Sequence, residues 1–147
     1  MNWLYNNKVI KEIKDFGKET PFGFVYITTH LPTGKQYIGK KSLYHNVRKK
    51  LGKKALAEYK GPGRKPKSIV ERKESDWKTY HGSEATIQKL IKQGKQSEFT
   101  REILYLAPNK KLLTYEEVRL QFKYEVLKHP DEWFNGTILG TFYSSDF

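Results

Sequence analysis

The residues of this sequence whose types and spacing best suit chemistry are two tyrosines that precede a run of basic residues. Tyr26 and Tyr37 lie eleven positions apart, and residues 31–35 between them carry turn chemistry. Residues on adjacent antiparallel strands can face the same side, so we expect both hydroxyls on one surface. A phenol has a pKa of about 10, and the basic residues that follow Tyr37 favour the phenolate. Either tyrosine can then serve as, or orient, a general base; the alternative is core packing.

Several other kinds of active site are excluded. There is no cysteine, which rules out disulfides, Cys-ligated zinc and thiol nucleophiles. No Gly-x-Ser-x-Gly elbow of a serine hydrolase occurs, and no Gly-rich nucleotide loop follows a strand. The four histidines lack the spacing of metal ligands; they are His30, His45, His81 and His129.

Positive charge is concentrated in one segment. Residues 40–73 hold thirteen basic and two acidic residues, so they carry +11 of the formal net charge of +12. Clustered Lys and Arg bind polyphosphates, because neutralising phosphates releases counterions. A solvated face is the alternative, and an anionic membrane is disfavoured because few large apolar residues accompany the charges. The predicted nucleic-acid contacts are Lys41, Lys49, Lys50, Lys53, Lys54, Arg64, Lys65 and Lys67.

Length and composition favour one compact domain. The chain has 147 residues, of which 37% are apolar and 14% aromatic, enough to bury a core. No apolar run approaches the roughly 20 residues that span a bilayer, and the first residues do not have the pattern of a signal peptide. We therefore expect a cytoplasmic protein without a membrane partner. Its oligomeric state is not predicted.

The elements that position these residues follow from apolar spacing and turn signals. In chain order we predict a helix over 4–16, a hairpin of strands over 23–28 and 36–39, a helix over about 43–59, a helix over 83–93, a strand over 99–106, a helix over 114–128, and an apolar tail over 137–143 that can add a strand. This order predicts a mixed α+β fold, a small three-stranded antiparallel sheet flanked by helices. Residues 1–20 would form a helical extension, and residues 21–147 a single domain with a basic insertion at about 49–73.

The two predicted hairpin strands resemble the signature strands of the GIY-YIG endonuclease family. The first is Gly23-Phe24-Val25-Tyr26 and the second is Tyr37-Ile38-Gly39-Lys40. The resemblance extends over roughly residues 21–136, and residues 81–94 and 99–104 are similar to the middle of phage homing members. The sequence departs from the family pattern where Phe24 takes the place of the first motif's glycine. The basic insertion is also longer than in the minimal domain.

The resemblance implies a metal-dependent DNA endonuclease encoded by a phage or mobile element. It implies that Glu117, on a late helix, holds one divalent ion, Mg²⁺, with Glu116 as the fallback ligand. One carboxylate is enough where waters and a substrate phosphate complete the coordination. It places Arg48 on the helix after the second strand, where its guanidinium binds the scissile phosphate. The remaining candidates for the catalytic site are Lys40 as a second possible base, His81 and Asn135.

Each of these assignments has an alternative. Residues 114–117 also match a capping box, in which Glu117 bonds back to the start of a helix. Arg48 can be solvated surface, His81 a loop histidine, and Asn135 a turn residue before Gly136. The alternative for the whole chain is a non-catalytic nucleic-acid-binding protein that retains the fold.

Overall fold

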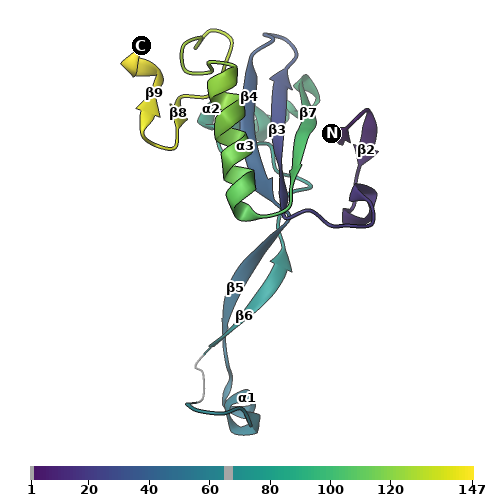
Figure 1. Cartoon of the computed structure of the whole chain (residues 1–147). Coiled ribbons are helices and arrows are strands. Elements are labelled where there is room, and N and C mark those ends of the chain that lie inside the picture. The colour runs from purple at the N-terminus through teal and green to yellow at the C-terminus, as the bar shows by residue number, and fades with distance from the viewer. Residues whose placement is uncertain (1, 65–67) are drawn as a thin grey trace. The chain divides into compact units, whose positions relative to one another are not determined.

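A computed structural model describes residues 2–64 and 68–147 (Figure 1). The chain divides into two compact units. The first runs up to Leu43 and resumes at Asp76, and the second comprises Tyr44–Ser75. No helix in the described ranges is long and apolar enough to cross a membrane.

The first unit is built on a five-stranded sheet with the order β2-β1-β7-β3-β4. Its strands are β1 (Trp3–Tyr5), β2 (Lys8–Ile10), β3 (Gly23–His30), β4 (Gln36–Ser42) and β7 (Phe99–Ala107). β1 runs parallel to β7, whereas the other pairs are antiparallel. The mixed α+β class is confirmed, but the prediction of three strands in an antiparallel sheet is wrong.

The predicted helix over residues 4–16 is absent. The segment forms β1, β2 and a 3₁₀ helix over Ile13–Phe16. Asn6 and Asn7 join the two strands with φ values of 48° and 64°. Two successive positive φ angles are typical of the type I′ turn of a two-residue hairpin, which asparagine tolerates. The hairpin lets Trp3 enter the core, where its side chain is almost fully buried.

The hairpin of β3 and β4 and the strand β7 confirm the predicted strands. Tyr26 pairs with Gly39, and Thr28 pairs with Tyr37. Successive residues of β3 point to opposite faces of the sheet. Val25 belongs to the core cluster on one face, whereas Phe24 and Tyr26 pack against Trp3 on the other.

Two α-helices belong to the described part of this unit, α2 (Ala85–Lys92) and α3 (Lys110–Lys123). Glu84 caps α2 by accepting a hydrogen bond from the Ile87 amide. Asn109 caps α3 by accepting a hydrogen bond from the Leu112 amide. In Figure 1 α3 lies against the sheet, and its Leu113 and Leu120 belong to the core cluster that includes Val25.

The C-terminal tail does not extend the main sheet. Its strands β8 (Thr137–Ile138) and β9 (Phe142–Tyr143) pair only with each other among the described residues. Ile138 still contributes to the core cluster next to Val126 and Leu127.

The second unit is a β-ribbon with a short helix at its tip. β5 (Tyr44–Lys50) pairs antiparallel with β6 (Ser68–Glu74), and α1 (Lys53–Glu58) lies between them in the chain. The predicted helix over about 43–59 is wrong for most of its length, because seven of its residues form a strand and six form a helix. Lys65 and Lys67, two of the predicted nucleic-acid contacts, lie outside the described residues.

Candidate functional site

The two signature tyrosines lie on the same face of the sheet, as strand parity predicts. The ring centroids of Tyr26 and Tyr37 are 6.3 Å apart, with an angle of 44° between the planes. Gly39 lies directly under them: an added Cβ would be 2.5 Å from the Tyr26 hydroxyl and 2.8 Å from Cε1 of Tyr37. Gly82, with a φ of 113°, approaches the same two rings, at 3.3 Å from its would-be Cβ. Two glycines therefore allow this close packing of the tyrosine pair.

The hydroxyl of Tyr26 is not on the surface, contrary to the prediction. The residue is 0% exposed and packs edge-on against Trp3 and Tyr80. Its hydroxyl makes no hydrogen bond of standard geometry within the described part of the chain. Burial, together with the nearby Tyr37 and Tyr80, raises the pKa of Tyr26 well above its usual value. The prediction that nearby cations favour a phenolate is therefore wrong for this residue.

Tyr37 is the more accessible member of the pair. Its hydroxyl oxygen lies 3.4 Å from the Ser83 Oγ. Burial raises the pKa of Tyr37 above its ordinary value of 10, and nearby Tyr80 and Glu117 raise it further. The hydrogen bond with Ser83 lowers the pKa but does not cancel these effects. Tyr37 is thus a neutral phenol near pH 7, able to donate a hydrogen bond.

Lys41 does not provide the expected charge on the tyrosine hydroxyls. Its ammonium lies 2.6 Å from an Asp76 carboxylate oxygen and 4.1 Å from the centre of the Tyr80 ring. Its charge is therefore directed to an acidic partner in the same unit, which weakens its predicted role as a phosphate contact.

Glu117 lies in the middle of α3 and faces Lys40 on β4. The Lys40 ammonium is 3.8 Å from a Glu117 carboxylate oxygen and donates to Thr114 Oγ1 at 2.9 Å. The Lys40 backbone amide also lowers the pKa of the carboxylate. Because α3 begins at Lys110, capped by Asn109, the capping-box alternative for Glu117 is excluded.

The environment of Glu117 fits a hard cation. Its side chain is 16% exposed, and burial raises its pKa even though Lys40 lowers it. Since the Lys40 charge offsets burial only in part, further positive charge would stabilise the carboxylate. By contrast, Glu116 is paired with Arg119, with nitrogen–oxygen distances of 2.8 and 2.9 Å. No group of three or more His, Asp or Glu in residues 2–64 and 68–147 forms a multi-carboxylate metal site.

Asn135 is placed by both of its polar atoms against one residue of β4. Its Oδ1 accepts from the Ile38 amide at 3.0 Å, and its Nδ2 donates to the Ile38 carbonyl at 2.9 Å. Gln121 of α3 donates to the same carbonyl at 3.1 Å. Asn135 therefore positions the second signature strand, and a catalytic role for it stays a prediction.

His81 has a defined tautomer. Its Nδ1 lies 2.8 Å from the Thr79 carbonyl, which can only accept, so Nδ1 carries the proton and Nε2 is an acceptor. Nε2 is buried and has no hydrogen-bond partner among the described residues. Burial lowers the pKa of His81 below 6.5, and the Arg101 charge lowers it further, so the ring is neutral near pH 7. His30 differs, since its two ring nitrogens contact Thr33 and Glu98.

Arg101 is a buried residue next to the candidate site that the sequence analysis missed. It is 1% exposed on β7, with its guanidinium 4.3 Å from the Trp3 ring. It donates to the Tyr80 carbonyl at 2.7 Å and to the Lys78 carbonyl at 3.2 Å, and so ties the loop before His81 to the sheet. Burial lowers its pKa to about 10. The available signal was its inward position between buried Phe99 and Ile103 in a strand of alternating pattern.

The basic side chains of residues 44–64 belong to the second unit. Arg48 lies on β5 and not on the helix that its predicted catalytic role required. The predicted helix is wrong at this position, and the role of the guanidinium at the scissile phosphate stays a prediction. The other described members of the predicted nucleic-acid set in this unit are all exposed: Lys49, Lys50, Lys53, Lys54 and Arg64.

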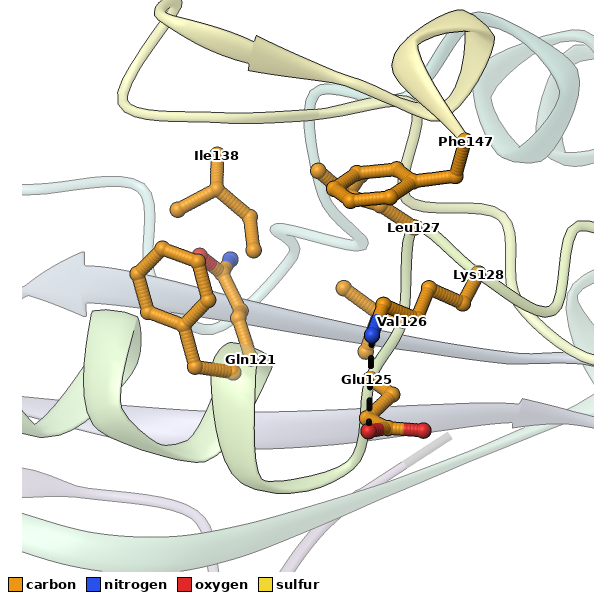
Figure 2. Close-up of a pocket in the computed structure, with 8 residues that line it drawn as sticks. Gln121, Glu125, Val126, Leu127, Lys128, Ile138 and Phe147 are labelled. Atoms are coloured by element: carbon orange, nitrogen blue, oxygen red, sulfur yellow. Dashed lines mark ion pairs between the residues drawn. The ribbon is translucent and has the colours of Figure 1, made fainter.

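A small apolar pocket lies away from the tyrosine pair, between the end of α3 and the tail (Figure 2). Its lining includes Val126, Ile138 and Phe147. The charged groups at its rim, Glu125 and Lys128, pair with each other at 3.8 Å. Without convergent free polar groups, this pocket is a packing feature and not a candidate catalytic centre.

Comparison with protein families identifies one matching family, described as "Putative endonuclease segE, GIY-YIG domain", over residues 3–138. The match covers both signature strands, α3 and Asn135. Comparison with curated proteins and with solved structures gives no match.

Proposed function

The chain belongs to the GIY-YIG endonuclease family, and we propose that it is a metal-dependent DNA endonuclease encoded by a phage or another mobile element. The observation that carries the catalytic part of this proposal is the edge of β4. There Lys40 and Glu117 are paired, and Lys40 shares the face of Val25 and α3, whereas Tyr37 lies on the other face of the same edge strand. The charge of Glu117 contributes to the raised pKa values of Tyr26 and Tyr37. A partly buried carboxylate, an ammonium and a neutral phenol are the groups that phosphodiester hydrolysis needs.

In this proposal Glu117 holds one divalent ion, Mg²⁺, which would supply positive charge at the phosphate. A single carboxylate accepts several contacts, so the ion pair with Lys40 at 3.8 Å leaves oxygen lone pairs for a cation. Glu116 is the weaker candidate, because Arg119 already neutralises its carboxylate.

The protein groups have separate tasks in the reaction. Water attacks phosphorus, the bond to the 3′ oxygen breaks, and the products carry a 5′ phosphate and a 3′ hydroxyl. Tyr37, held as a neutral phenol, donates to a phosphoryl oxygen and orients the phosphate. Lys40 stabilises the charge that develops on the phosphoryl oxygens. His81 is neutral, and its Nε2 accepts no hydrogen bond from the described residues, so it is the candidate acceptor for the proton of the attacking water. Because Nε2 is buried, this role requires that substrate binding opens access to it.

Tyr26 holds the ring of Tyr37 in position. Its ring packs on Gly39 and Tyr37, while burial disfavours its deprotonation. We therefore assign the base role to His81 and keep Tyr26 as the residue that orients Tyr37. The exposed cations of the second unit supply the attraction to the DNA backbone.

The decisive experiment is cleavage of supercoiled plasmid with Mg²⁺ and with EDTA, using a matched pair of neighbouring variants. Glu117→Gln should lower the cleavage rate about 10²-fold or more, because a bound metal supplies several kcal/mol of transition-state stabilisation. Glu116→Gln removes a carboxylate one residue away whose side chain is equally buried, 17% against 16% exposed. It should stay within about threefold of wild type, because Arg119 and not the site is the partner of this carboxylate. DNA affinity should not fall in either variant.

Three outcomes would change the assignment. An active Glu117→Gln variant with an inactive Glu116→Gln variant would move the metal to Glu116. Normal cleavage in both would remove the metal site from α3. Absence of cleavage by the wild type with Mg²⁺, together with tight DNA binding, would favour the non-catalytic binding protein.

A further inference from the structure

The second unit presents a β-ribbon that has no packed face of its own. Seven register pairs join β5 to β6, from Tyr44 opposite Glu74 to Lys50 opposite Ser68 (Figure 1). Residues 45–50 and 69–74 are all exposed. Sheets ordinarily bury at least one face, and an isolated two-stranded hairpin is marginally stable in water. A partner that covers one face would therefore stabilise this ribbon.

The charge of the ribbon selects the chemistry of that partner. None of the seven register pairs sets a Lys or Arg directly opposite an Asp or Glu. The cations of the two strands are Arg48, Lys49, Lys50, Arg72 and Lys73, against two glutamates. We propose that the ribbon enters the major groove of duplex DNA and reads base edges with the face that carries Asn46, Arg48 and Arg72. This inference rests on the proposed function in one respect, that duplex DNA is the substrate.

Strand alternation separates the side chains into two faces of different chemistry. Asn46 lies opposite Arg72, and Arg48 lies opposite Val70, so these four residues share one face. Arginine pairs with guanine, asparagine with adenine, and an apolar side chain contacts the thymine methyl group. Two neighbouring register pairs of this face thus carry three kinds of base-reading side chain, namely arginine, asparagine and an apolar residue.

The opposite face is less suited to bases. It carries Glu71 opposite Val47 and Ile69 opposite Lys49. A carboxylate in the middle of this face is repelled by phosphates and accepts hydrogen bonds only from cytosine. Lys49 and Lys73 of this face are suited to phosphate contacts, which position the protein without reading sequence.

One reading side chain is already held in place. The Arg72 guanidinium carbon is 3.9 Å from the centre of the Tyr44 ring on the same face. Stacking on an aromatic ring preorganises the planar guanidinium, so less freedom is lost when it pairs with a base.

The dimensions of the ribbon select the groove. Two strands with their side chains fit the B-form major groove, which is about 12 Å wide, and exceed the minor groove of about 6 Å. Seven residue pairs extend over roughly 20 Å, equal to about six base pairs at about 3.4 Å each. The major groove of A-form RNA is too narrow for side chains to read, so the geometry favours DNA over duplex RNA.

The test is a binding selection with the intact chain from a randomised duplex DNA pool in EDTA. Two double variants form a matched pair: Arg48→Gln with Arg72→Gln, and Lys49→Gln with Lys73→Gln. Each removes two positive charges from neighbouring positions of the same two strands, but from opposite faces. Dimethyl sulfate interference on the selected duplex then reports the groove, because it modifies guanine N7 in the major groove and adenine N3 in the minor groove.

We expect the wild type to enrich a sequence motif with interference at guanine N7. The Arg48 and Arg72 double variant should lose preference for the motif about tenfold or more. The Lys49 and Lys73 double variant should keep the motif and bind all sequences more weakly, with a salt slope lower by about 0.9 for each phosphate that is no longer neutralised. Arg48→Gln alone leaves the Arg72–Tyr44 stack in place and should still weaken the guanine preference, which separates reading from loss of ribbon structure.

The proposal is overturned by a wild type that binds without enriching any motif, by interference only at adenine N3, or by a motif that survives in the Arg48 and Arg72 variant. It is also overturned if both double variants lose the motif equally. Plasmid cleavage is measured separately. A wild type that selects a major-groove motif but does not cut DNA contradicts the proposed function and leaves the base-reading role of the ribbon standing.

Discussion

Gly39→Ala is expected to destabilise the protein and to disturb both signature tyrosines at once. The added Cβ would lie 2.5 Å from the Tyr26 hydroxyl, 2.7 Å from its Cζ and 2.8 Å from Cε1 of Tyr37. All three separations are far below a normal contact, so at least one ring must move. Tyr26 has little room, because Trp3 and Tyr80 pack against it.

The size of the effect follows from these contacts. Overpacking a close-packed region costs about 1–3 kcal/mol, which lowers the melting temperature of a domain of this size by roughly 3–9 °C. Gly136→Ala is the matched control in the same unit, since nothing lies within 4 Å of its would-be Cβ. That variant should melt at or slightly above the wild-type temperature, because alanine restricts the unfolded chain.

A double-mutant cycle identifies the contact responsible. Tyr26→Phe removes the atom nearest to the new Cβ, so Gly39→Ala should cost less in the Tyr26→Phe background, by about 0.5–1.5 kcal/mol. Thermal melting and plasmid cleavage are measured for the four proteins of the cycle. A Gly39→Ala variant that melts within about 1 °C of the control and cleaves normally would refute the claim that this glycine allows the tyrosine packing.

Three further predictions concern single groups of the site. Tyr26→Phe should leave the free energy of unfolding unchanged or raise it by about 1 kcal/mol, because the lost hydroxyl is buried without a standard hydrogen bond. Tyr37→Phe should lower the plasmid-cleavage rate about 10²-fold, a larger loss than that of Tyr26→Phe. The cleavage rate should be flat from about pH 7 to 9, because the pKa values of both tyrosines lie above 10. It should fall with acidity below 6.5, where His81 gains its proton through a lowered pKa, and His81→Gln should abolish this decline. Asn135→Asp should lower the free energy of unfolding by about 1–3 kcal/mol in urea titrations, since a carboxylate cannot donate to the Ile38 carbonyl.

Each of these predictions has a distinct contrary result. Equal losses of cleavage in the two Phe variants would give Tyr26 a direct part in the reaction. An acid decline that survives His81→Gln would belong to another group, with Glu117 next because burial raises its pKa. An Asn135→Asp variant as stable as wild type would mean that Gln121 alone holds the Ile38 carbonyl.

The hairpin of β3 and β4 was predictable because aromatic and β-branched residues precede a Pro- and Gly-containing turn. The facing of Tyr26 and Tyr37 followed from the parity of adjacent antiparallel strands. The position of a residue along a strand determines the face of the sheet to which its side chain points, but not how deeply it is buried. The burial of the Tyr26 hydroxyl and its raised pKa could therefore not be predicted. Burial depends on Trp3, which reaches the pair only because β1 joins β7, far away in the chain.

The elements that the sequence analysis missed are short or uniformly charged. β1 and β2 have three residues each, and their apolar positions also match a helical spacing; the asparagine pair at 6–7 was the turn signal that could have separated the two. β5 carries Arg48, Lys49 and Lys50 in succession, so it shows no apolar period of either kind. Only its pairing with β6, some twenty residues later, defines it as a strand.

The outer edge of β4 connects the structural and the chemical parts of the site. At Ile38, Asn135 bonds both backbone groups, and Gln121 adds a second bond to the carbonyl. Two residues further on, the ammonium of Lys40 lies 3.8 Å from a carboxylate oxygen of Glu117. Gln121 and Glu117 are four residues apart and share one face of α3, so the bond that anchors the helix to Ile38 also sets the position of the carboxylate. Gln121 and Asn135, which bond the free backbone groups of Ile38, thus fix α3 against the edge of β4. This anchoring brings Glu117 of the helix next to Lys40 of the strand without a cluster of carboxylates.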